Sequence, residues 1–202
     1  ELLHWRTAYD ILSTGHLFAA NPLLPISSYY PGLELVTSAL AATHLSIFTS
    51  GVVLLAFARL AMMVALFVVY EEVSGSAHVA GLGVLVYTAT PNFLFWSSQF
   101  AYESLGLPLA VVVLALLALR SRRAGQRRRL LGIAAAVGIG AVILTHHLTS
   151  LFLVAFLFLW WLAGRWIGRG SAPARLRVPL WPALLAAVGV VVWAVIVAPD
   201  LI

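Results

Sequence analysis

The stretch Arg120-Ser121-Arg122-Arg123-Ala124-Gly125-Gln126-Arg127-Arg128-Arg129 separates two long apolar segments, and it decides the fold. Basic loops stay on the cytoplasmic side of a membrane. A second arginine group follows the next two apolar segments; it consists of Arg165, Arg169, Arg175 and Arg177. Both groups are therefore predicted on one face, with two membrane-spanning helices between them. These helices would turn at residues 145–147, on the other face.

The composition excludes a soluble globular domain. Hydrophobic residues make up 62% of the chain, charged residues 9%, and the mean hydropathy is +1.02. Ordinary domains carry about 25% charged residues. The net charge of +5 comes from arginines in loops, which indicates membrane anchoring and no binding of nucleic acid. Because there is no cysteine, disulfides and thiolate metal sites are excluded.

The sequence predicts an all-α integral membrane protein with a bundle of about six spans over residues 48–202. The predicted spans are Gly51–Tyr70, Ala77–Phe95, Phe100–Leu119, Leu130–Leu144, Leu148–Trp166 and Leu180–Val197. Pro91 should break the second span, since proline removes a helix hydrogen bond.

Residues 1–47 are predicted to form an extracytoplasmic loop with amphipathic juxtamembrane helices. A first helix should end at Gly15 and carry an exposed Arg6–Asp10 pair. Its apolar stripe, suited to the membrane interface, comprises Leu2, Trp5, Tyr9 and Leu12. Pro31 should start a second, shorter helix running to about His44.

Counting spans from the arginine loops assigns the other connections to one face of the membrane or the other. Residues 1–47, the Ser97–Glu103 junction and the His146–His147 turn come out extracytoplasmic, and Glu71–Ser76 comes out as a cytoplasmic loop. The chain opens on Glu1 without a methionine, so we expect at least one further helix upstream. Abundant Ala, Gly and Val with no Lys indicates a prokaryotic plasma membrane as the location.

Four ionisable residues in or beside the spans are candidates for chemistry. Glu103, at the outer end of a span, is costly there unless it is paired, bound to metal or exposed to water; the alternative is a solvated acid at a helix start. His146 and His147 could donate to a phosphate or serve as interfacial anchors. Arg59, inside its span, suits a structural ion pair as well as a ligand contact.

The order of these features resembles the GT-C fold glycosyltransferases that use polyprenyl-phosphate sugars, of the aminoarabinose and protein O-mannosyl transferase type. Glu1-Leu2-Leu3-His4 resembles the end of that family's Asp-Glu pair, and Ser28-Tyr29-Tyr30-Pro31-Gly32 resembles its lead into the next helix. Phe100-Ala101-Tyr102-Glu103 falls where the family has its second acid, and Leu144-Thr145-His146-His147 where relatives have Leu-Thr-Lys facing the lipid phosphate.

The resemblance implies a GT-C-like core with Glu1 and Glu103 as catalytic residues. It implies a substrate-binding set of His4, Tyr30, Arg59, Tyr102, His146 and His147. The cofactor would be a divalent ion, Mg²⁺ or Mn²⁺, with Glu103 as its ligand. Two departures matter: the family's catalytic Asp would lie just before Glu1, and histidine replaces lysine near the phosphate.

The predicted function is transfer of a sugar from a polyprenyl-phosphate donor to an acceptor glycan, lipid or protein at the extracytoplasmic face. One alternative is a transporter or flippase-like carrier of lipids or small solutes. Such carriers show inverted repeats or paired half-helices, and none is visible in the sequence. A second alternative is a non-catalytic membrane subunit.

Overall fold

The computed structural model describes residues 2–167 and 178–199, and within these ranges every regular element is helical. The helices are α1 (Leu2–Thr14), the 3-10 helix η1 (Pro25–Ser28), α2 (Gly32–Ala41), α3 (Ile47–Ser74), α4 (Ala77–Thr88), α5 (Pro91–Trp96), α6 (Glu103–Ser121), α7 (Gly125–Thr145), α8 (His147–Ile167) and α9 (Trp181–Ile196). The all-α prediction is confirmed over the described residues.

Four helices, α3, α6, α7 and α8, are long and apolar enough to cross a membrane. This is the make-up of a helical membrane protein. The other two predicted spans are shorter: α9 has 16 residues, and the second span is divided into α4, of 12 residues, and α5. The break falls at Thr90-Pro91 as predicted, and the Thr90 side chain accepts the Phe93 N–H at the start of α5.

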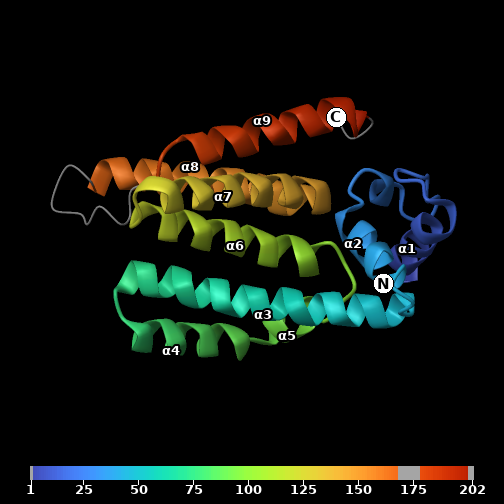
Figure 1. Ribbon diagram of the computed structural model, residues 1–202, viewed down its shortest axis with the longest axis horizontal. Helices are drawn as coiled ribbons and strands as arrows, with labels where there is room; N and C mark the ends of the chain where they lie inside the picture. The colour runs from blue at the N-terminus through green and yellow to red at the C-terminus, as the bar shows by residue number, and fades with distance from the viewer. Residues whose placement is uncertain (1, 168–177, 200–202) are drawn as a thin grey trace.

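The helices run back and forth, so the connections gather at two ends of the bundle (Figure 1). Helices α1 and α2 lie at the end where α3 begins, and the α6–α7 connection lies at the opposite end. We call these the α1–α2 end and the arginine end. The segments predicted to share a membrane face with residues 1–47 thus gather at the α1–α2 end.

The largest cluster of buried apolar residues lies between α6, α7, α8 and α9, where Val113, Leu117, Ile139, Val142 and Leu157 are at most 2% exposed. Large apolar side chains also cover the outside of the bundle. Phe57, Phe152 and Ile196, for example, are 66–72% exposed. An outer surface this apolar suits lipid contact, since lipid tails solvate it as well as a protein core does.

Two sequence expectations at the arginine end are corrected. Helix α3 continues to Ser74, so Glu71 and Glu72 belong to a helix and not to a loop; Gly75, with a positive φ of 74°, ends it. Buried Glu72 forms an ion pair with Arg122. Helix α7 starts five residues before the predicted span, so Arg127–Arg129 lie in its exposed first turns, consistent with the good helix propensity of arginine.

Helix α1 ends as expected, with Gly15 at a positive φ of 70° and its N–H bonded to the Ile11 carbonyl. Arg6 and Asp10 form the predicted exposed pair at 3.7 Å. Three members of the stripe predicted to face the membrane interface, Leu2, Tyr9 and Leu12, are exposed, and α1 buries a different face that carries His4, Thr7, Ala8 and Ile11. The exposed stripe is thus free to contact lipid.

Polar contacts hold α1 to the segments that follow it. The Asn21 side-chain amide donates to the Thr7 hydroxyl at 3.0 Å, and the Ser38 hydroxyl of α2 donates to the Ala8 carbonyl at 2.8 Å. These buried bonds explain why the more polar face of α1 turns inward. They also place buried polar groups at the α1–α2 end, beside its own apolar cluster of Leu33, Leu55 and Phe100.

Candidate functional site

A buried ion pair joins α1 to α2. His4 Nδ1 lies 2.8 Å from Glu34 Oε1; His4 is 7% exposed and Glu34 is fully buried. Burial raises the pKa of the Glu34 carboxyl, while the His4 hydrogen bond and charge act in the opposite direction. The second oxygen, Oε2, is buried without a hydrogen-bond partner in the described residues.

Tyr102 extends this pair toward the helix bundle. Its ring meets the His4 ring edge-on at 4.3 Å between centroids and stacks with the His146 ring at 5.9 Å. Burial, and then the charge of Glu34, raise the pKa of the Tyr102 hydroxyl, so the phenol stays protonated. Residues from α1, α2 and the α6 and α7 ends therefore meet around one buried carboxylate.

His146 connects the cluster to α8. Its Nδ1 lies 2.8 Å from the Thr149 hydroxyl, and the side chain is buried. Burial lowers the pKa of His146 from 6.5 to about 4, helped by His147, whereas the nearby Glu103 carboxylate opposes the shift. His146 is thus neutral at pH 7 and would act toward a ligand as a hydrogen-bonding group, not as a cation.

His147 lies next to His146, with ring centroids 5.2 Å apart, and packs against the Tyr30 ring at 5.3 Å. Tyr30 and His147 line a cavity of about 190 Å³ together with Ser150 and Trp193. The Trp193 indole N–H, across this cavity on α9, donates to the Tyr29 carbonyl at 3.0 Å. The cavity thus brings the polar segment before α2 together with α8 and α9.

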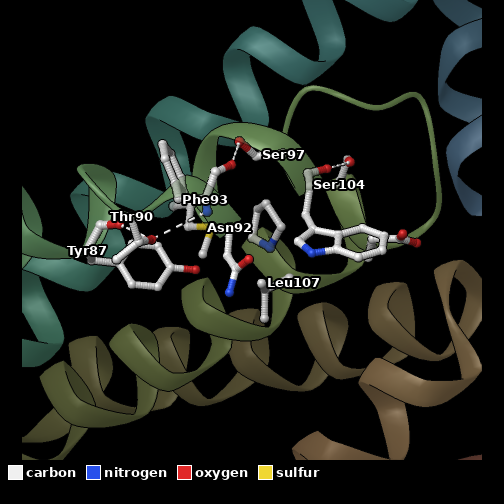
Figure 2. Close-up of a pocket in the computed structure, with 11 residues that line it drawn as sticks. Tyr87, Thr90, Asn92, Phe93, Ser97, Ser104 and Leu107 are labelled. Carbon is white, nitrogen blue, oxygen red and sulfur yellow. Dashed lines mark hydrogen bonds between the residues drawn. The ribbon is translucent and has the colours of Figure 1, made fainter.

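Glu103 lines a different cavity, of about 300 Å³, at the break between α4 and α5 (Figure 2). The labelled side chains of Tyr87, Asn92 and Leu107 face the same space. Glu103 is half-buried and has no hydrogen bond or ion pair among the described residues. It is joined to the histidines by its electrostatic effect on His146 and not by a shared cavity with His147.

Arg59 supports the segment that leads to Glu103. Its Nε donates to the Ser97 carbonyl at 2.9 Å and to the Ser97 hydroxyl at 3.0 Å. Ser97 closes α5, so this contact ties α3 to the start of the 97–102 connection. The Arg59 Nε is thereby engaged by the protein, through hydrogen bonds to Ser97 and not through an ion pair with an acidic side chain among the described residues.

The structure brings together most of the residues predicted to bind substrate. His4, Tyr30, Tyr102, His146 and His147 form a continuous set of contacts at the α1–α2 end, whereas Glu1 lies outside the described residues. Sequence reasoning missed Glu34 and Thr149. A carboxylate within the apolar run Leu33–Val36 was a signal that could have identified Glu34.

The described residues contain no group of three His, Asp or Glu side chains placed to hold a metal ion. The predicted Mg²⁺ or Mn²⁺ stays a prediction, and no step is assigned to it. No protein-family model, curated protein or solved structure matches this chain. The resemblance to the GT-C transferases accordingly remains a prediction from the quoted residues.

Proposed function

We propose that this chain is the membrane-embedded part of a glycosyltransferase that moves a sugar from a polyprenyl-phosphate donor to an acceptor hydroxyl. The observation that carries the proposal is the meeting of four distant segments at the α1–α2 end. They contribute His4, Tyr30, Tyr102 and the two histidines 146 and 147, beside the unpartnered Glu103 carboxylate. Polar side chains thus converge at one end of an otherwise apolar bundle.

The residue types suit this chemistry. A sugar on a phosphate is already activated, so the protein needs a base for the acceptor hydroxyl and donors for the departing phosphate. Glu103 would take the acceptor proton. His147, which shares its cavity with Tyr30, would donate to the phosphate, and neutral His146 would position Tyr102 beside them.

The proposed location is a prokaryotic plasma membrane with the arginine end in the cytoplasm and the α1–α2 end outside. The chain has no cysteine, so single introduced thiols can report on sidedness. In intact cells, an impermeant thiol reagent should label exposed position 13 after Ser13→Cys and spare position 126 after Gln126→Cys. Labelling of position 126 but not of position 13 would invert the orientation.

The activity is tested with the protein in lipid nanodiscs and a panel of polyprenyl-phosphate sugars, by following loss of the lipid-linked sugar in the presence of membrane acceptors. Glu103→Gln should lower turnover about 100-fold or more, as expected for loss of a general base. Donor affinity should stay close to that of the parent, because the carboxylate acts on the acceptor.

The matched control is Glu71→Gln, the same chemical change at the arginine end, which should leave turnover unaltered. Two results would reject the proposal. One is the absence of transfer from every donor by a folded parent protein. The other is equal loss of turnover in both variants, which would indicate a general effect of removing a carboxylate.

A further inference from the structure

The cavity at the α4–α5 break is lined by four helices and is open on one side. Tyr87 comes from the last turn of α4, Asn92 and Trp96 from α5, Met62 from α3, and Leu107 from α6. Its volume of about 300 Å³ lies at the lower end of the range for small-molecule sites, which is about 300–1,000 Å³. The cavity therefore has room for one small ring.

Three hydroxyls in this cavity are already used by the protein. Thr90 donates to the Tyr87 carbonyl and Ser104 to the Trp96 carbonyl, both at 2.7 Å, and Ser97 donates to the Phe93 carbonyl. These bonds satisfy backbone carbonyls near the ends of α4 and α5, where the helical pattern is interrupted. They account for the hydroxyl side chains without a ligand.

Three other polar side chains in the same wall are not accounted for in this way. The Tyr87 phenol, the Asn92 amide and the Glu103 carboxylate have no hydrogen bond within residues 2–167 and 178–199. Tyr87 and Glu103 are half-buried and Asn92 is exposed, so these three groups are open to water or a ligand. Together they offer a carboxylate acceptor and two groups that both donate and accept.

The rest of the wall is aromatic and aliphatic. Tyr87 and Phe93 are in edge contact at 5.4 Å between centroids, and Trp96 and Leu107 add further apolar surface. An apolar wall with a few convergent polar groups suits a ligand that has a C–H face and a rim of hydroxyls. A sugar ring has this combination, whereas a lipid tail would leave the carboxylate and amide unpaired.

We infer that this cavity is the sugar-binding site of the protein, with Asn92, Tyr87 and Glu103 bonding the hydroxyls and Trp96 and Phe93 covering the ring face. The inference rests on the proposed function, since Glu103 serves both. The bound ring belongs either to the lipid-linked donor or to an acceptor glycan, and the chemistry of recognition is the same for both.

The test measures binding rather than turnover. Protein in nanodiscs is titrated with polyprenyl-phosphate mannose, glucose and arabinose, with the same polyprenyl phosphate lacking a sugar, and with the three methyl glycosides. Asn92→Leu removes the amide at similar size, and Leu107→Trp fills the cavity. Leu94→Trp is the control, since Leu94 lies on α5, is 60% exposed and does not line the cavity.

For a donor site, at least one sugar lipid should bind about tenfold or more tightly than bare polyprenyl phosphate, about the worth of one well-made hydrogen bond. Asn92→Leu and Leu107→Trp should abolish this preference for the sugar lipid and leave binding of the bare lipid unchanged. The control Leu94→Trp should keep the preference. For an acceptor site, the methyl glycosides should show this loss instead. Unchanged sugar binding in both folded cavity variants would overturn the inference about this cavity. The proposed function would still stand in that case if the parent protein transfers sugar.

Discussion

Replacing Glu34 with alanine should destabilise the α1–α2 end by about 3–5 kcal/mol, the cost of breaking a buried ion pair. Glu34 is fully buried, and its Oε1 is the partner of His4 Nδ1 at 2.8 Å. The alanine variant would leave the His4 ring without its acceptor and open a space beneath Tyr102. Thermal unfolding in detergent, with limited proteolysis of residues 2–44, would measure the loss.

A double-mutant cycle separates the pair from simple loss of volume. Glu34→Gln keeps the shape and an oxygen that can accept from His4, so it should cost much less than alanine. His4→Leu combined with Glu34→Leu removes both polar partners and should be less destabilising than the sum of the two single changes. Additive costs would show that His4 and Glu34 do not stabilise each other, contrary to the observed geometry.

This pair also illustrates what the sequence could not predict. His4 and Glu34 are 30 residues apart, and the Arg59–Ser97 contact joins residues 38 apart. Helical periodicity reports neighbours three or four positions away and is silent about such partners. The sequence therefore indicated that Arg59 needed a partner without identifying it, and it left Glu34 unassigned.

Features set by local chemistry were predicted well. Gly15 ends α1, Pro91 follows the break in the second span, and Arg6 pairs with Asp10 one turn away. The sequence identified the apolar stripe of α1 but not its buried face, which is set by the polar network of Thr7, Asn21 and Ser38. In a membrane protein an apolar stripe can face lipid, so hydrophobicity alone does not identify the inward side.

The catalytic and binding assignments depend on longer-range packing. The arginine distribution predicted which connections share an end of the bundle, and this grouped Tyr102 with His146 before any contact was known. It could not divide the polar residues between the cavity of Glu103 and that of His147, because side-chain directions at helix ends depend on how the helices cross.

The second large effect is expected at Gly32, where α2 begins against the end of α7. A Cβ at this position would lie 2.8 Å from the Thr145 Cα and 3.0 Å from the Leu144 carbonyl oxygen. Both are backbone atoms, so rotation of a side chain cannot relieve the clash. Gly32→Ala should therefore push α2 away from α7 and lower the free energy of unfolding by about 3 kcal/mol, the upper part of the usual range for overpacking.

The same displacement should reach the site, because Tyr30 lies two residues before Gly32 and packs on His147 at 5.3 Å. Donor binding should weaken together with stability in Gly32→Ala. Gly140→Ala is the matched control: it lies in α7, a Cβ there meets nothing within 4 Å, and helix propensity favours alanine by up to about 1 kcal/mol. Equal thermal unfolding of the two variants would mean that α2 and α7 are not in the close contact on which the α1–α2 end depends.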